Sequence, residues 1–217
     1  MADIQKQMAE RVAAISSQVG SAGPPRIKIN KDKTFTLPTG ETSDQLSVVI
    51  LAWRTHHLYY DKKYQEGEVN PPVCFAVGPD PKNMTPSPNA PKKQADKCNV
   101  NNKSVCPFDV FGSDGRGKLC QNRRVLAVLA PDANQETEIL TLSVSPTGLR
   151  RFDAYVESVK AAFKAIPISV ITQIGFLDNA QYTTLTFSKP VPNPNMKAMW
   201  PRLDEAEHLV SIEPIGG

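Results

Sequence analysis

The feature that most constrains this chain is a long irregular stretch that contains all of its cysteines. Seven prolines between Asn70 and Pro91 exclude a helix and most strand pairing there, and the irregular composition continues to about Asn122. A stretch of about fifty residues without regular structure is improbable inside a compact domain unless something else orders it. We therefore expect the four cysteines of this stretch to bind a structural metal ion. They are Cys74, Cys98, Cys106 and Cys120.

Zinc is the metal that four cysteines favour, because four thiolates complete its tetrahedral coordination and the bound ion can replace a missing core. The cysteines are separated by 23, 7 and 13 residues, so the seven residues Asn99–Val105 must project as a loop. Two alternatives remain open: four buried free thiols, or two disulfides, which a reducing cytosol disfavours. His56 or His57 could replace one cysteine, although adjacent residues of a strand point to opposite faces.

Length and composition are those of a medium-sized soluble globular protein. The chain has 217 residues, of which 40% are hydrophobic and 22% are charged. No apolar run approaches the roughly 18–20 residues that span a membrane, and charged residues interrupt Met1–Gly20, which argues against a signal peptide. We therefore expect a cytoplasmic protein that does not bind a membrane.

The charge is unevenly distributed, with a basic centre and a mildly acidic end. From Leu51 to Arg124 there are 12 Lys and Arg residues against 7 Asp and Glu residues, whereas the rest of the chain has 13 against 15. This distribution indicates a surface that binds a polyanion and a C-terminal tail that could compete for it. An uneven solvated surface without a partner would show the same distribution.

The N-terminal residues have the pattern of an amphipathic helix. Apolar residues recur at spacings of three and four from Ile4 to Val19, and Gly20 is a plausible end of the helix. Ser21–Pro25 then forms a linker. The helix over residues 1–20 is therefore an appendage, which could pack on the body or mediate self-association with another copy of the chain.

The remaining elements predict an α+β protein with mainly β structure. A helix should begin at Ser145-Pro146 and end near Ala165, and a last helix over Asn195–Ile212 should be interrupted at Pro201. The expected strands are Arg26–Ile29, Thr34–Leu37, Leu46–Arg54, His56–Tyr64, Arg124–Ala130, Ile139–Val144, Ser169–Phe176 and Gln181–Ser188.

The order of these elements favours an OB-fold, a small Greek-key barrel that binds single strands and oligosaccharides, although other barrels with one helix fit it too. A helix lies before the final pair of strands, and the irregular stretch is inserted earlier. We expect an N-terminal helix over 1–20, an OB-like domain over 24–190 and a C-terminal helix and tail over 195–217. The zinc-binding insertion of the OB-like domain should span 70–123.

A glycine-rich turn, Gly112–Lys118, matches the G-x-x-x-x-G-K part of a phosphate-binding loop. The next residue is Leu119, where that motif requires Ser or Thr to hold magnesium, and no parallel βαβ unit follows. Nucleotide binding is therefore disfavoured. The turn could instead carry Arg116 and Lys118 toward a backbone phosphate, or it could simply shape the metal site.

The segments PPVCFAVG and CPFDVFGSDGRGKLCQNRRVLAVLAP, with the cysteine between them, resemble proteins of bacteriophages and related mobile elements. The shared features are Cys-Pro, a Phe-Gly-Ser turn, Gly-Lys, a last Cys, and an Asn-Arg-Arg run into a strand. The chain thus resembles phage single-stranded DNA-binding proteins that carry a zinc-bearing insertion in an OB-fold, similar in plan to the replication binding proteins of T-even phages.

The resemblance covers about residues 70–131 and implies a role in phage DNA replication and recombination in the host cytoplasm. It implies zinc ligation by Cys74, Cys98, Cys106 and Cys120, and it puts Arg123 and Arg124 beside a binding groove. Single-stranded DNA and phage replication proteins would be the partners.

Binding of a single strand without sequence preference needs cations for the phosphates and aromatic faces for the bases, with roughly 1–3 kcal/mol from each stacked base. The central region interleaves both kinds of side chain. Trp53 could equally be a core residue, and Lys62-Lys63 could serve only solubility. The expected DNA-binding residues are Trp53, Arg54, Tyr59, Tyr60, Lys62, Lys63, Tyr64, Phe108, Phe111, Arg116, Lys118, Arg123 and Arg124.

No catalytic motif is present in the sequence. It contains no H-E-x-x-H, no G-x-S-x-G and no carboxylate cluster spaced to hold catalytic magnesium. Four cysteine ligands would also leave zinc without an open coordination position. We therefore expect a protein that is not an enzyme. The alternative function is a zinc-stabilised protein–protein interaction module whose basic surface is incidental.

Overall fold

The computed structural model describes residues 24–62, 70–91, 96–101 and 103–214. The helix expected over residues 1–20 lies outside these ranges. Among the described residues, no helix has the length and apolar character needed to cross a membrane.

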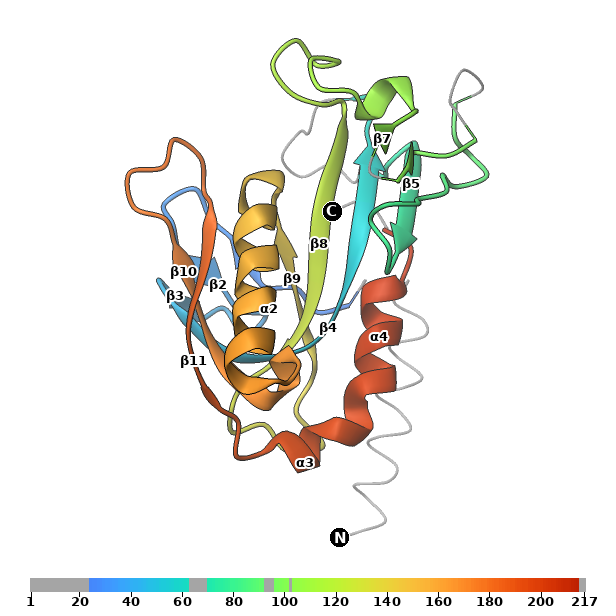
Figure 1. Ribbon diagram of the computed structural model, residues 1–217. Coiled ribbons are helices and arrows are strands. Elements are labelled where there is room, and N and C mark those ends of the chain that lie inside the picture. Colours follow the sequence, from blue (N-terminus) through green and yellow to red (C-terminus); the bar gives the residue numbers. More distant parts are fainter. Residues whose placement is uncertain (1–23, 63–69, 92–95, 102, 215–217) are drawn as a thin grey trace, which may run out of the picture.

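A six-stranded antiparallel sheet organises the described chain (Figure 1). The strand order is β11-β10-β4-β8-β9, and β5 also pairs with β4. β10 pairs with the first residues of β4 and β5 pairs with its last residues, so both lie along the same edge of β4. The bounds are β4 Leu46–Tyr59, β5 Cys74–Gly78, β8 Cys120–Leu129, β9 Leu140–Val144, β10 Val170–Phe176 and β11 Leu185–Pro192.

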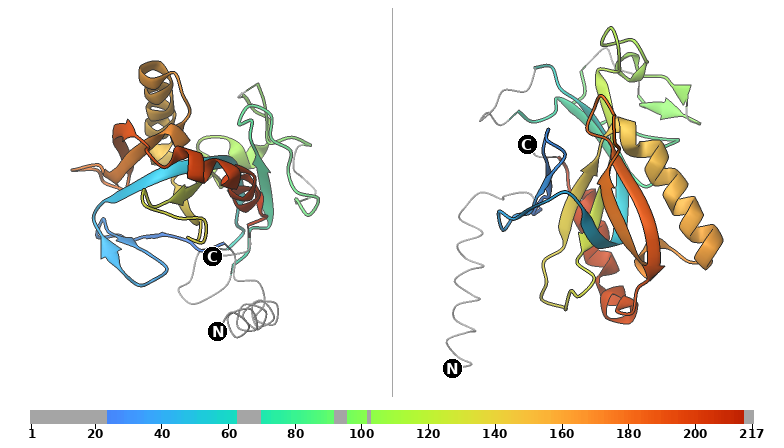
Figure 2. Two further views of the ribbon diagram at one scale, coloured as in Figure 1. Left: turned by 90° about the horizontal axis from the view of Figure 1, so that it is seen from below. Right: turned by 90° about the vertical axis from the view of Figure 1, so that its left-hand side faces the viewer.

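β4 is one long, curved strand where the sequence predicts two (Figure 2). Its pairing with β8 is continuous from Val49 to Tyr59 except for a register shift between Ile50 and Ala52. Such a bulge adds one residue and reverses the alternation of side chains beyond it. As a result, Trp53, Thr55, His57 and Tyr59 point to one face of the sheet, and the residues between them point to the other.

Two helices cover opposite faces of this sheet. α2 (Leu149–Phe163) lies against the face that carries Leu126 and Leu142, in a core that also contains Phe152. α4 (Leu203–Ser211) lies against the other face (Figure 1). There Ala206 and Val210 pack in a second core with residues of β4 and β8. The expected C-terminal helix is divided into α3 (Met196–Met199), η4 (Trp200–Arg202) and α4, as the proline at position 201 predicts.

The start of α2 differs slightly from the prediction. A short 3-10 turn, η2 (Pro146–Gly148), precedes the α-helix, and Ser145 makes no side-chain capping hydrogen bond. Another turn, η3 (Pro167–Ser169), separates the helix from β10. Proline without an amide hydrogen suits the first position of each turn.

A small three-stranded sheet, made of β1 (Lys28–Ile29), β2 (Phe35–Thr36) and β3 (Thr42–Ser43), packs against the main sheet. Phe35 is fully buried and stacks on Phe176 of β10 with ring centroids 4.4 Å apart. The chain just before β1 bonds to β9, because the Ile27 amide donates to the Thr141 carbonyl oxygen over 2.9 Å. Residues 25–27 thereby cover the outer edge of β9.

The fold class is confirmed as α+β with mostly antiparallel sheet, but a closed barrel is not found among the described residues. β9 and β11 are the two ends of the main sheet and do not pair with each other. β9 cannot pair with β11 along its outer edge, because Thr141 on that edge hydrogen bonds to the segment before β1.

The insertion between β4 and β8 is less irregular than the sequence predicts. It contains β5, the hairpin of β6 (Asn99–Val100) and β7 (Lys103–Ser104), and the turn η1 (Pro107–Asp109). The hairpin lies within the seven-residue gap between Cys98 and Cys106. We call the described part of residues 74–120 the cysteine lobe; it lies at one end of β4 and β8 (Figure 1).

Candidate functional site

The end of the sheet that carries the cysteine lobe has a different chemistry on each face. On the face shared with α2, the side chains of β4 and β8 meet the lobe. On the face shared with α4, the same two strands line an open cavity. His56 and His57 are adjacent and therefore divide between the two faces.

All four cysteines are buried in the lobe, and Cys120 lies within electrostatic range of the other three. No three of the cysteine sulfur atoms lie within 4.8 Å of one another in the described chain. Cys74 and Cys120 both pair with Tyr59, one on each side, so the three side chains share a face. The Cys106 amide donates to the Cys98 carbonyl oxygen over 3.3 Å, which holds these two residues together at the base of the hairpin. Burial and the neighbouring cysteines raise the pKa of the Cys98 thiol to about 12.

A second donor set overlaps the first at Cys120. Ligand atoms of His57, Asp109 and Cys120 all lie within 4.8 Å of one another, and all three residues are buried. Asp109 is only 2% exposed, and its two carboxylate oxygens accept hydrogen bonds from Lys118 Nζ at 2.9 Å and Ser104 Oγ at 3.0 Å. A metal ion could be held by this buried group.

The chemistry of His57 and Cys120 suits metal binding better than nucleophilic catalysis by the thiol. A reactive thiol needs a lowered pKa and access, whereas burial, followed by the nearby Asp109 carboxylate, raises the pKa of Cys120. Burial lowers the pKa of His57 to about 4, so its imidazole is neutral at pH 7, as metal ligation requires. Its Nδ1 is buried without a hydrogen-bond partner among the described residues, which leaves a free donor or acceptor beside the thiols.

Aromatic residues of the lobe pack against the sheet end. Tyr59 and Phe108 stack face to face, with centroids 4.4 Å apart and an interplanar angle of 1°.

Phe111 is 77% exposed, next to the exposed Val110, and Arg116 is exposed on the glycine-rich turn. That turn is closed by a bond from the Gly112 amide to the Gly117 carbonyl oxygen. Gly112 has φ +92°, a conformation that favours glycine.

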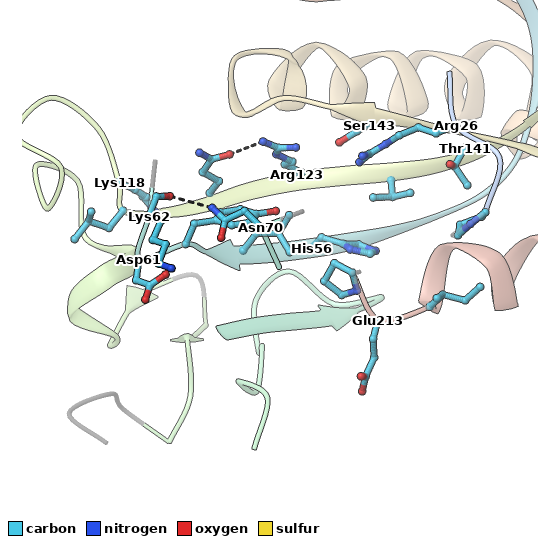
Figure 3. A pocket seen from close by; sticks show the side chains of 18 of the residues that line it. Arg26, His56, Asp61, Lys62, Asn70, Lys118, Arg123, Thr141, Ser143 and Glu213 are labelled. Carbon is cyan, nitrogen blue, oxygen red and sulfur yellow. Dashed lines mark hydrogen bonds between the residues drawn. The ribbon is translucent and has the colours of Figure 1, made fainter. Parts of the chain in front are cut away.

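The opposite face carries a cavity of about 640 Å³, which we call the groove (Figure 3). The face of β4, β8 and β9 on the α4 side forms the floor of the groove. The cysteine lobe bounds one end of the groove, and the residues after α4 bound the other end. Four lining residues are cationic: Arg26, Lys62, Lys118 and Arg123. Three lining residues are acidic, namely Asp61, Asp114 and Glu213, and Lys118 pairs with Asp109 of the lobe at 2.9 Å. The lining also includes His56, Tyr60, Gln121, Thr141 and Ser143.

The expected DNA-binding residues divide between these surfaces. Tyr60, Lys62, Lys118 and Arg123 line the groove. Trp53 lies on the α2 face and packs edge-on against Phe152, 5.5 Å between centroids.

Two of the expected arginines are engaged in ion pairs. Arg54 is on the groove side but pairs with Glu207 of α4 at 2.9 Å. Arg124 is buried on the α2 side and pairs with Asp153 at 3.6 Å. Lys63 and Tyr64 lie outside the described residues.

Sequence reasoning missed several residues that the fold brings to these sites. Asp109 was detectable only as a carboxylate three positions after Cys106, a weak signal without the fold. Alternation along a strand allowed one histidine of the pair to join the cysteines, and it is His57. Arg26 reaches the groove only because its segment bonds to β9 at Thr141, a contact between residues far apart in sequence.

No protein-family model, no curated protein and no solved structure matches this chain.

Proposed function

We propose that this protein binds single-stranded DNA without sequence preference in the groove, and that it acts in phage DNA replication or recombination. The observation that carries the proposal is that Arg26, Lys62 and Arg123 line a cavity built on β8 and β9. Cations along a groove attract phosphates, and an aromatic side chain such as Tyr60 can stack on a base.

The topology supports an OB-like assignment, with the barrel left open. In an OB-fold, oligonucleotides bind on the face of the second and third strands and on the loops after the first and fourth. If β4 is the first strand, β8 and β9 are the second and third, and α2 precedes β10 and β11 as expected. The groove then lies on β8, β9 and the long connection after β4, which is the binding region of that fold.

We further propose that the cysteine lobe holds one structural zinc ion through Cys74, Cys98, Cys106 and Cys120. Asp109 is a weaker candidate ligand, since Lys118 and Ser104 already occupy both of its oxygens. His57 would then act as an outer partner that orients a thiolate ligand through its ring N–H. The ion would supply the order that the lobe lacks, because its own apolar cluster contains only Ala76, Met84 and Cys98.

The two donor sets make opposite predictions for single variants. We expect one zinc ion per chain in the wild type, measured by elemental analysis after dialysis. Cys74→Ser should lose the ion, and His57→Ala should keep it with about 10–100-fold weaker affinity, as for other outer partners. Loss of zinc in His57→Ala together with full retention in Cys74→Ser would instead assign the ion to His57, Asp109 and Cys120.

Binding of oligo-dT to the wild type tests the groove directly. With about three phosphates neutralised, the slope of log K against log[salt] should be near −2, so affinity should fall roughly 10–20-fold between 50 and 200 mM salt. Anisotropy of a labelled oligonucleotide is the suitable readout, since Trp53 lies on the opposite face of the sheet from the groove. Absence of binding at 50 mM salt would refute the proposal.

The alternative, a zinc-stabilised protein interaction module, is favoured by one observation. Val105, Val110 and Phe111 expose apolar surface on the lobe. Under the DNA-binding proposal oligo-dT lies in the groove, which Phe111 does not line, so Phe111→Ala should leave oligo-dT binding unchanged. Under the alternative the wild type does not bind oligo-dT, and the same variant weakens only the complex with the partner.

A further inference from the structure

Three nitrogen-bearing side chains converge on the part of the groove farther from the cysteine lobe. Arg123 of β8 pairs in register with His56 of β4, and Arg26 enters from the segment that bonds to β9. Figure 3 shows Arg123, Ser143 and Arg26 in a row along β8 and β9, with His56 beside them. The pKa of His56 is lowered mainly by burial and also by both arginines, which confirms that the three groups lie within electrostatic range.

The two arginines of this part of the groove have no carboxylate partner among the residues that the structure describes. Arg54, Arg124 and Arg202 each pair with a carboxylate, whereas neither Arg26 nor Arg123 forms a salt bridge within the described ranges. Glu213 lines the same cavity, but its side chain extends away from both arginines (Figure 3). The fold therefore brings two positive charges together without neutralising them.

Arg123 also retains an unused donor. Its terminal nitrogen donates to Gln121 Oε1, but its Nε is buried and has no hydrogen-bond partner among the described residues. An unsatisfied buried N–H costs free energy unless a ligand accepts its hydrogen. Burial lowers the pKa of Arg123, the nearby Tyr60 opposes this shift, and Arg26 adds to it. An anion bound between the arginines would neutralise their positive charge and accept the Nε hydrogen of Arg123.

We propose that Arg26 and Arg123 form a subsite for one phosphate group, with Ser143 as an additional hydroxyl partner. His56 flanks the subsite and does not donate to the anion, because its Nε2 hydrogen bonds to the Val210 carbonyl oxygen over 2.8 Å and the other ring nitrogen is then an acceptor. This inference rests on the proposed function and gives it a position: one phosphodiester of the bound strand lies here. The guanidinium groups can hold a phosphate through paired N–H donors, which a lysine cannot reproduce. The adjacent Tyr60 then provides a stacking face for the neighbouring base.

The experiment compares three arginine variants with the wild type on two probes. Arg26→Gln and Arg123→Gln remove charge from the subsite, and Arg150→Gln removes the same charge from the exposed surface of α2, on the other face of the sheet. Labelled (dT)15 is titrated over a salt series. Pyrophosphate is titrated separately while the side-chain Nε–H resonance of Arg123 is followed by NMR, with thermal unfolding as the folding control.

We expect each subsite variant to bind (dT)15 about tenfold more weakly and with a salt slope reduced by about 0.7, while Arg150→Gln stays within about twofold of wild type. Arg123→Lys should keep the salt slope of the wild type, because it keeps the positive charge. It should bind (dT)15 more weakly, because it lacks the Nε donor. Pyrophosphate should shift the Arg123 resonance in the wild type. If Arg123→Gln does not fold, the exposed Arg26 still provides the test.

The outcomes separate the subsite from the function. If (dT)15 binds the wild type but both subsite variants behave like Arg150→Gln, the subsite is wrong and the function stands. If (dT)15 does not bind but pyrophosphate shifts Arg123, the subsite stands and DNA binding is wrong. If pyrophosphate leaves Arg123 unchanged and the variants match the control, the inference is overturned.

Discussion

Serine in place of Cys120 is expected to abolish zinc binding and to unfold the cysteine lobe while the α2 half of the protein remains folded. Cys120 is common to both donor sets, and it is the first residue of β8. Structural zinc contributes about 10–16 kcal/mol of binding free energy in small zinc domains, far more than the three-residue cluster of Ala76, Met84 and Cys98 can supply. Amide hydrogen exchange should show loss of protection in β5 and retention in α2 and β10.

The matched control for Cys120→Ser is Val105→Ser, a substitution at an exposed position of the same lobe. Val105→Ser should keep zinc and keep the exchange pattern of the wild type. Native protection of Ala76 and Met84 in zinc-free Cys120→Ser would show that the lobe folds without a metal ion. A chelator added to the wild type should reproduce the Cys120→Ser pattern.

Replacing Phe152 with alanine is expected to lower the free energy of unfolding by about 3–5 kcal/mol. Phe152 is 1% exposed in the core under α2 and contacts Trp53 and Phe187, at 5.5 and 5.3 Å between ring centroids. The loss combines removed apolar contacts with the cavity that remains. Urea unfolding followed by Trp fluorescence measures the effect.

Glu157→Ala, on the exposed side of the same helix, is the control for Phe152→Ala. Its ion pair with Lys160 spans 3.5 Å with both side chains 71% exposed, so its removal should change stability by less than about 1 kcal/mol. A Phe152→Ala variant as stable as Glu157→Ala would mean that the core under α2 does not contribute as its burial indicates.

Local patterns predict much of this fold because they depend on neighbours in sequence. The apolar stripe of Leu149–Phe163 predicts α2, and the proline at position 201 predicts the break before α4. The strands expected over Leu46–Arg54 and His56–Tyr64 are one strand, β4, because its pairing with β8 continues through Thr55, and nothing in the sequence marks the bulge after Ile50. The closed barrel could not be tested from sequence, because pairing of edge strands is a long-range contact.

The candidate site shows the same division between local and long-range information. The four cysteines can be chosen as candidate ligands from the sequence alone, and alternation along a strand already implies that His56 and His57, like Arg123 and Arg124, must separate. The sequence could not say which member faces which side, because the bulge in β4 decides the phase. Asp109 and Arg26 join their sites through contacts with distant segments.

The continuity of β4 also bears on whether this protein is modular. Residues 60–119 form one continuous insertion in the sequence. The sequence alone therefore suggests that this insertion could be grafted as a unit into another protein. Yet β5 pairs with Tyr59 and its neighbours, and the floor of the groove is the reverse side of the strands that carry His57 and Cys120. The lobe and the groove therefore share a single structural wall, so a graft into another scaffold would have to carry that wall, and changes on either side of it are not independent.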